Sequence, residues 1–397
     1  MAKLTLNDID VQGKKVLMRV DFNVPIINGE ITDDNRVVQA LPSIQHVIDA
    51  GALLILTSHL GRPKGERNPE FSLKPVAEHL ASLIDAKVHF ADDCIGEAAS
   101  SVIEKADFGE IVVLENVRFH KEETDNETGF AKALASHADV FVNDAFGSSH
   151  RAHASVAGVT EFLQPSASGY LLEKEIRYLS DSVNDPNRPF VAILGGAKVS
   201  DKIPVIENLI NKVDTIIIGG GMAYTFLVAN GKSVGNSLLQ EEMVSTAKKL
   251  MEDAKKAGVN LMLPFDFVIA DDFSNEANQE VVDEDNIKDD WEALDIGPQS
   301  AIAFGNAIKA AKTVVWNGPM GVFEMPSFAE GTNAVAMALV EATKFGATTI
   351  IGGGDSASAI KQAGLSDQVS HVSTGGGASL EYLEGKDLPG VSSLTDK

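Results

Sequence analysis

The sequence predicts an α/β protein with two doubly wound parallel sheets joined by a helix. First, its 397 residues exceed what one hydrophobic core usually organises, so we expect two domains. Second, short apolar runs end in polar or glycine-rich turns, as buried parallel strands do. Third, helical patterns separate these runs, which is typical of the α/β class. The composition, 44% hydrophobic and 23% charged, is that of a folded globular protein.

Each half of the chain contains one series of alternating strands and helices. In the first half, strands are predicted over Lys15–Arg19, Leu53–Thr57, Ile111–Leu114 and Val140–Asn143. The helices between them are predicted over Leu41–Ala50, Leu73–Ile84 and Phe130–His137. In the second half, strands are predicted over Phe190–Leu194, Thr215–Ile218, Leu261–Leu263, Thr313–Trp316 and Thr348–Ile351. The helices there are predicted over Lys202–Asn211, Gln240–Ala257 and Ala329–Lys344. We therefore expect two domains of similar size.

The boundary between the two series falls in residues 165–190. A charged amphipathic helix is predicted over Tyr170–Val183, and the segment 184–189, which holds two prolines, ends it. Such a helix could be a hinge or a plain spacer, and composition does not decide between them. Farther along, residues 271–295 are strongly acidic but lack the glycine and ligand spacing of a calcium loop. We expect a solvated excursion there.

The composition also argues against several classes of protein. With 33 basic and 57 acidic residues, the net charge is −24, which disfavours bulk binding to nucleic acid or anionic lipid but allows a local basic pocket. The single cysteine, Cys94, excludes an internal disulfide, and we expect no cysteine-based zinc or iron–sulfur site. Neither a secretory pattern nor a membrane-spanning apolar run is visible. We expect a soluble, cytoplasmic protein.

The arginines predict an anion-binding site in the first half. All eight lie before position 189, and eight of the nine histidines lie before position 154. Residues that follow parallel strands meet at the edge of the sheet where ligands bind, and the arginine fork suits carboxylates and phosphates. The polar residues near the ends of the predicted strands include Asn23, Arg36, His59, Arg62, Arg118 and Arg151. One such arginine would more often form a surface ion pair, but four favour a site for a small, multiply anionic molecule. A Ser-His-Asp triad is the weaker interpretation, because no nucleophile elbow is present.

Three glycine triplets in the second half predict contacts to phosphate groups, at 219–221, 352–354 and 375–377. Glycine lets backbone N–H groups approach an anion, and a helix N-terminus favours negative charge. Lys198 and Lys202 lie one helical turn apart, and Asp355 could hold Mg²⁺ beside phosphate oxygens. A single triplet would be explained by a tight strand-to-helix turn without a ligand. At 352–354, Asp355 or Ser356 would then be the N-cap of the helix. The missing Walker A motif and incomplete dinucleotide fingerprint disfavour a P-loop ATPase and a dehydrogenase. Together the two halves suit phosphoryl transfer. This reaction needs the two substrates to be aligned, the phosphate charge to be neutralised and the two domains to close on the substrates.

The combined motifs resemble the phosphoglycerate kinase family over almost the whole chain. The matching stretches are Arg19–Pro25, Ser58–Pro63, Glu115–His120, Asn143–Ser155, Val191–Lys202, Trp316–Glu324, Gly352–Ser356 and Ser373–Lys386. The resemblance implies reversible, Mg²⁺-dependent glycolytic exchange of ATP and 3-phosphoglycerate with ADP and 1,3-bisphosphoglycerate, by direct in-line transfer. It also implies a monomer with two Rossmann-like domains. Residues 1–169 would bind 3-phosphoglycerate, 170–189 would form the hinge, 190–372 would bind nucleotide, and 373–397 would return to the first domain.

The resemblance assigns roles to individual residues. The residues implied to bind 3-phosphoglycerate are Asp21, Phe22, Asn23, Arg36, His59, Leu60, Gly61, Arg62, Arg118 and Arg151. Those implied to bind nucleotide are Lys202, Gly219, Asn317, Gly321, Glu324, Gly353, Gly354, Asp355 and Ser356, with Asp355 also holding the metal. The implied catalytic residues are Arg36, Lys198, Lys202 and Gly376. The implied partners are these small molecules, with no nucleic acid and no membrane. The competing hypotheses are a non-catalytic sensor of nucleotide and sugar-phosphate-like anions, and an NAD-dependent dehydrogenase.

Overall fold

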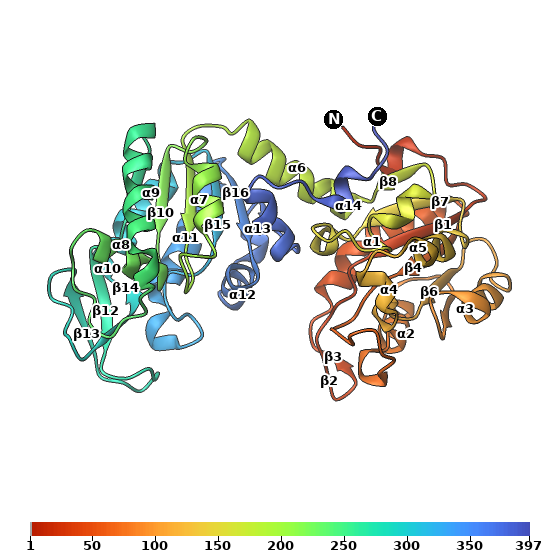
Figure 1. Ribbon diagram of the computed structural model, residues 1–397, viewed down its shortest axis with the longest axis horizontal. Helices are drawn as coiled ribbons and strands as arrows, with labels where there is room; N and C mark the ends of the chain where they lie inside the picture. Colours follow the sequence, from red (N-terminus) through yellow and green to blue (C-terminus); the bar gives the residue numbers. More distant parts are fainter. Residues whose placement is uncertain (1) are drawn as a thin grey trace. The chain divides into compact units, whose positions relative to one another are not determined.

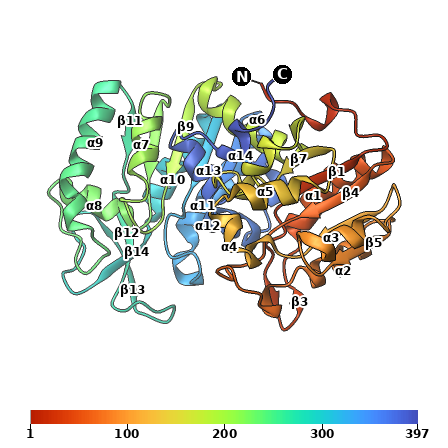
Figure 2. The ribbon, with the colours of Figure 1, turned by 45° about the vertical axis from the view of Figure 1, so that its right-hand side comes forward.

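The computed structural model describes residues 2–397, with the backbone alone at Asp181. The chain forms two compact units (Figure 1). The first unit runs through Ile176 and takes back Asp387–Lys397, while the second unit comprises Arg177–Lys386. The two ends of the chain lie side by side in the first unit (Figure 2), where the backbone N–H of Leu4 donates to the carbonyl of Thr395 over 2.9 Å. In the described part of the chain, no helix is long and apolar enough to cross a bilayer.

The first unit is built on a six-stranded sheet with the order β5-β6-β4-β1-β7-β8, in which every pairing is parallel. Its strands are β1 (Lys15–Val20), β4 (Leu53–Thr57), β5 (Val88–Ala91), β6 (Ile111–Leu114), β7 (Val140–Asp144) and β8 (Ser166–Ser168). The helices of this unit are α1 (Asn35–Asp49), α2 (Lys74–Leu83), α3 (Gly96–Ile103), α4 (Lys121–Thr124), α5 (Thr128–Ala135) and α14 (Pro389–Ser392). A short hairpin, β2 (Ile26–Ile27) with β3 (Glu30–Ile31), precedes α1.

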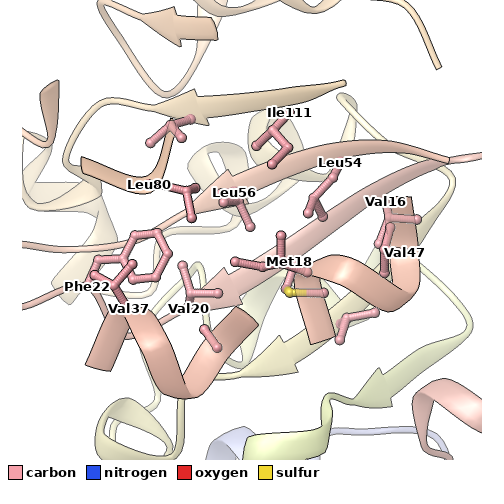
Figure 3. Packing of buried hydrophobic residues seen from close by; sticks show 14 of the residues in the cluster. Val16, Met18, Val20, Phe22, Val37, Val47, Leu54, Leu56, Leu80 and Ile111 are labelled. Atoms are coloured by element: carbon pink, nitrogen blue, oxygen red, sulfur yellow. The ribbon is translucent and has the colours of Figure 1, made fainter. Parts of the chain in front are cut away.

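The core of the first unit explains why its central strands read as continuous apolar runs. Figure 3 shows side chains of β1, such as Met18, packed among residues of α1 and β4, such as Val47 and Leu56. All five residues of β4 are buried, because a parallel sheet in the middle of a domain is covered on both faces. Leu17 on β1 is likewise buried, outside the cluster that holds Met18. The sheet is thus a rigid base for the turns at its carboxyl edge.

The second unit repeats this plan with a parallel sheet of order β11-β10-β9-β15-β16-β17. Its strands are β9 (Phe190–Leu194), β10 (Thr215–Ile218), β11 (Asn260–Met262), β15 (Thr313–Asn317), β16 (Thr348–Gly352) and β17 (His371–Val372). The helices are α7 (Ile203–Leu209), α8 (Met222–Ala229), α9 (Val244–Ala257), α10 (Pro298–Ala310), α11 (Glu330–Lys344), α12 (Gly354–Gln362) and α13 (Gly377–Leu383). The predicted α/β class with two parallel sheets is confirmed. The helix α6 (Tyr170–Asn184) spans the boundary of the units, and its role as a hinge stays a prediction.

The acidic segment, predicted as a solvated excursion, contains β-strands. It contains β13 (Gln279–Asp283) and most of β14 (Glu292–Ile296), which pair antiparallel with the two sides of β12 (Asp266–Ala270). The reason is that β14 carries a buried stretch, while most side chains of β13 are exposed to solvent. The acidic residues are therefore solvated as expected, but on a small sheet whose apolar residues pack on the unit.

In both sheets the chain first adds strands on one side of a central strand and then crosses to its other side. The point of reversal lies beside β1 in the first unit and beside β9 in the second. The chain passes from β1 to strands on one side and then to β7 on the other, and β9 is flanked in the same way by β10 and β15. In open α/β sheets, ligands bind outside the carboxyl ends of the strands at such a point of reversal. The turns after β1, β4, β9 and β15 are therefore where a site is expected.

Candidate active site

The first unit gathers basic and polar groups in the turns after β1, β4 and β6. We call the residues Asp21, Asn23, Arg36, His59, Gly61 and Arg118 the arginine cluster. Nη1 of Arg36 lies 3.1 Å from Oδ1 of Asp21 and donates to the carbonyl of Asn23 over 3.0 Å. Asp21 is almost fully buried, whereas the Arg36 side chain is one-third exposed. The carboxylate thus holds a partly exposed guanidinium in place at the edge of the sheet.

Gly61 links the turn after β1 to the turn after β6. Its N–H donates to Oδ1 of Asn23 over 2.8 Å, and its carbonyl accepts from Nη1 of Arg118 over 2.9 Å. Its φ is +61°, and a Cβ there would lie 2.4 Å from the ring of Phe71. Only glycine fits this position without displacing Phe71, so the turn fixes both Asn23 and Arg118.

The arginine cluster is strongly electropositive. Burial first, and then the charge of Arg19, lowers the pKa of Arg118 to about 10. Burial and the charges of Arg19, Arg118 and Arg36 hold the pKa of His59 well below its ordinary range. Like charges held together in this way are stabilised by a bound anion, so the arrangement favours a small, multiply charged one.

The other residues expected in this site fall into two groups. The side chains of Phe22 and Leu60 are buried in the hydrophobic core, so only their backbones could reach a ligand. Arg62 and Arg151 are exposed, and Nε of Arg151 donates to Nε2 of His150 over 2.9 Å. Because Arg151 also lowers the pKa of Arg118, its charge lies near the cluster.

A buried network beneath the cluster was missed from the sequence. Arg19 is fully buried, and its Nε donates to Oγ of Ser155 over 2.8 Å. That hydroxyl donates in turn to Oε1 of the buried Glu123 over 2.6 Å. His153 lies beside them, and burial together with Arg118 and Arg19 lowers its pKa to about 4. Arg19 stands inside β1, where the expected partner of a strand residue is another apolar side chain, so its role was not apparent.

The second unit contains a cavity of about 430 Å³ at the carboxyl edge of its sheet, which we call the glycine cavity. Its lining residues include Lys198, Lys202, Asn317, Gly353, Gly354, Asp355, Ser356 and Gly376. These eight lie at the end of β15, in the turns after β9, β16 and β17, and in the first turn of α12. Parallel strands bring their ends together here although the residues are far apart in sequence.

Hydrogen bonds connect residues from three of these segments in the glycine cavity. Nζ of Lys202 donates to Oδ1 of Asn317. The buried Oγ of Ser356 accepts from the backbone N–H of Gly318 over 2.6 Å. Burial lowers the pKa of Lys202, against the opposing effect of Asp201 and Asp355. Lys198, by contrast, is exposed.

The helix α12 begins in this cavity, preceded by Gly353. The φ of Gly353 is +88°, and a Cβ there would lie 3.0 Å from Nδ2 of Asn317. The first N–H groups of a helix lack partners inside the helix and favour an anion. Gly376 has φ +49° and stands just before α13 in the same lining. Both turns therefore favour glycine through their positive φ, and both line the cavity.

The glycine triplet at 219–221 lies in a close backbone packing contact, and its contact with phosphate stays a prediction. The N–H of Gly219 donates to the carbonyl of Leu194 over 2.9 Å, and that of Gly220 to Met320 over 3.0 Å. A Cβ on Gly219 would lie 2.4 Å from Sδ of Met320. These glycines let the segment after β15 lie close against the turn after β10. Gly219 does not line the glycine cavity, and neither do Gly321 and Glu324, which follow on that segment.

Asp355 fits the requirements of a magnesium ligand. It is exposed in the first turn of α12, lines the glycine cavity, and its charge acts on Lys202. Mg²⁺ binds through one or two carboxylates and keeps waters and substrate phosphate oxygens as its other ligands. One carboxylate beside a helix N-terminus matches this kind of donor set.

These features are those of a two-unit α/β kinase, with clustered arginines in one unit and a glycine- and lysine-lined cavity in the other. The family model described as phosphoglycerate kinase matches residues 6–386, and the chain belongs to this family. The chain is therefore a phosphotransferase.

Similar proteins cover the chain almost completely. The phosphoglycerate kinase of Clostridium botulinum (strain Hall) is 56% identical over 397 residues, covering 100% of this chain and 99% of the relative. That of Chloroherpeton thalassium is 55% identical over 396 residues, with full coverage of both. The solved phosphoglycerate kinase from Coxiella burnetii is 41% identical with a TM-score of 0.90, and that from Pyrococcus horikoshii OT3 is 31% identical with a TM-score of 0.82. Each structure covers 98% of both chains.

Proposed function

We propose that the chain transfers a phosphoryl group reversibly between 1,3-bisphosphoglycerate and ADP, giving 3-phosphoglycerate and ATP in glycolysis. The observation that carries this proposal is the division of anion-binding chemistry between the units. The arginine cluster offers rigid guanidinium forks, whereas the glycine cavity offers lysines and backbone donors. The first suits a small phosphate-bearing acid and the second suits the phosphate chain of a nucleotide.

In the arginine cluster, each proposed contact uses a group already held in place. Arg36 is fixed by Asp21, and Arg118 by the carbonyl of Gly61. Preorganised donors bind an anion without losing much side-chain entropy on binding. Arg62 and Arg151 are exposed beside them and would approach the ligand from the rim. The acidic surface, with its net charge of −24, makes such a concentration of positive charge necessary for binding anions.

In the glycine cavity, the start of α12 would bind nucleotide phosphates through Gly353, Gly354 and Ser356, and Lys202 would neutralise their charge. Asn317 orients Lys202, and Asp355 would hold Mg²⁺. The metal would neutralise phosphate charge and orient the phosphate oxygens. Gly219, Gly321 and Glu324 lie outside the cavity, and we propose that they meet the nucleoside part.

We propose direct in-line transfer, with Arg36, Lys198 and the turn at Gly376 stabilising charge on the moving group. Phosphoryl transfer needs positioning and electrostatic stabilisation and little covalent chemistry from the protein. Because the groups belong to two units, the reaction requires the units to close on their ligands, which would also exclude water. We further propose that the enzyme is a cytoplasmic monomer without nucleic-acid or membrane partners. Sedimentation of the purified chain would test whether it is a monomer.

A coupled assay tests the proposed reaction. ADP formation should depend on ATP, 3-phosphoglycerate and Mg²⁺ together. A chain that binds both ligands without forming ADP would instead be a sensor, the competing hypothesis. Omitting 3-phosphoglycerate is the matched control, because ADP formed without it would indicate simple ATP hydrolysis.

A further inference from the structure

Three side chains with different metal-binding donors meet in the first unit. Asp93 and Cys94 lie in the loop between β5 and α3, and His120 follows the short helix η3 (Val117–Phe119). Nε2 of His120 is 2.7 Å from Oδ1 of Asp93, and one donor atom from each of the three residues lies within 4.8 Å of the others. We propose that Asp93, Cys94 and His120 bind a divalent cation of the zinc class.

The spacing of the donors suits such an ion after a small adjustment. Bonds of about 2.0–2.3 Å in a tetrahedral zinc site place its ligand atoms roughly 3.3–3.8 Å apart. The largest separation here, at most 4.8 Å, must close by about an ångström, whereas Nε2 of His120 and Oδ1 of Asp93, 2.7 Å apart, must open by roughly half an ångström or more. Both Asp93 and His120 lie on connections between regular elements, where side chains can rotate without disturbing a helix.

The kinds of donor atom select the metal. A thiolate, an imidazole and a carboxylate suit Zn²⁺ or Co²⁺, whereas Mg²⁺ and Ca²⁺ take oxygen ligands. Three protein ligands leave a fourth position for water. A single cysteine led us to expect no cysteine-based zinc site, but the fold adds nitrogen and oxygen donors that sequence spacing does not reveal.

Access and charge also favour a cation. The side chains of Asp93 and His120 are 34% and 26% exposed, while Cys94 is buried behind them. The carboxylates of Asp93 and Glu123 act electrostatically on Cys94 and would attract a cation. On binding, the thiol proton leaves to solvent. The thiolate and the Asp93 carboxylate then balance the two positive charges, with His120 as a neutral ligand.

Cobalt titration of the full-length protein in excess Mg²⁺ tests this site. Mg²⁺ occupies oxygen-ligand sites such as Asp355, so bound Co²⁺ reports the mixed-donor site. We expect one Co²⁺ per chain with a thiolate-to-cobalt charge-transfer band. Cys94→Ala should abolish the band, and His120→Asn should weaken Co²⁺ binding at least about tenfold. The matched control is His79→Asn, because His79 pairs with Asp34 over 3.0 Å without a cysteine. The His79→Asn variant should bind Co²⁺ with the affinity of the wild type.

Two results would overturn the site: no charge-transfer band in the wild type, or equal Co²⁺ affinity in wild type and His120→Asn. Because a change at the buried Cys94 could affect folding, a second measurement uses the unaltered chain. Zinc titration by calorimetry in buffers of different ionisation enthalpy should show release of at least one proton per ion. Zinc binding without proton release would exclude the thiol as a ligand.

Discussion

Nη2 of Arg19 lies 3.1 Å from Nδ1 of His59 in the buried floor of the arginine cluster. A guanidinium only donates, so Nδ1 must carry the lone pair and the ring hydrogen is on Nε2. Burial and the surrounding arginines keep His59 neutral by lowering its pKa. Arg19 is therefore a positioning residue that presents His59 as a hydrogen-bond donor.

Arg19→Lys should weaken 3-phosphoglycerate binding about tenfold and raise the pKa of His59, because an ammonium cannot hold both Ser155 and His59 in the guanidinium geometry. Ligand titration and NMR titration of His59 measure the two effects. Arg188→Lys is the control, since Arg188 forms an exposed pair with Asp214 in the second unit. An unshifted His59 titration would contradict this role of Arg19.

Arg36→Ala and Lys198→Ala should each lower kcat by roughly 100-fold or more, because stabilisation of transferring charge is lost. Nucleotide binding should change far less, and steady-state kinetics with separate nucleotide titrations measure the difference. Lys249→Ala removes an exposed lysine from α9 and should leave kcat unchanged. Near-wild-type turnover in either site variant would remove that residue from the mechanism.

Gly353→Ala should weaken Mg-nucleotide binding while 3-phosphoglycerate binding stays unchanged. The new Cβ would crowd Asn317 and disturb the start of α12. Gly258→Ala is the matched control: its φ is +74°, but nothing lies within 4 Å of the added carbon. Backbone strain should lower the free energy of unfolding by about 1–2 kcal/mol in Gly258→Ala, whose conformation is left-handed helical. The cost should be about 1–3 kcal/mol in Gly353→Ala, whose φ of +88° and ψ of +152° are open essentially only to glycine. Equal nucleotide affinity in the two variants would place the phosphates elsewhere.

Two buried carboxyls should make the enzyme less stable as pH rises. Burial raises the pKa of Asp144 and of Asp295 to about 7. Both carboxyls also accept hydrogen bonds from backbone N–H groups, which lower the pKa but do not offset the burial. Between about pH 4 and 7 the folded state holds protons that the unfolded state releases, so the free energy of unfolding falls with rising pH. Each group contributes at most about 1.4 kcal/mol per pH unit. In urea unfolding, Asp144→Asn and Asp295→Asn should each flatten this dependence relative to the surface variant Asp253→Asn, and an unchanged slope would contradict the shifted pKa.

The parallel sheets could be predicted because their strands are buried on both faces and carry the signal locally. The bounds predicted for Leu53–Thr57 and Phe190–Leu194 are those of β4 and β9. The strand β13 could not be predicted, since its exposed acidic side chains resemble a loop and its pairing with β12 depends on tertiary structure.

In the arginine cluster and the glycine cavity, too, the sequence could not predict the contacts that depend on tertiary structure. Residues at strand ends, such as Asn317 and Asp355, could be brought together from the topology of a parallel sheet. The buried contact of Arg19 with His59 joins β1 to the turn after β4, and no sequence spacing indicates it. The glycine triplet 219–221 predicts a phosphate turn, and the structure adds a packing requirement that the sequence does not reveal: a Cβ on Gly219 would meet Met320, which approaches from a distant segment.

The division of ligands between the units is tested most directly by calorimetry with each ligand separately. 3-Phosphoglycerate and Mg-ADP should each be titrated into Arg62→Ala and Lys202→Ala. We expect Arg62→Ala to lose at least tenfold in affinity for 3-phosphoglycerate and to keep its affinity for Mg-ADP. Lys202→Ala should show the opposite pattern. Loss of both ligands in both variants, or the reverse assignment, would contradict the division.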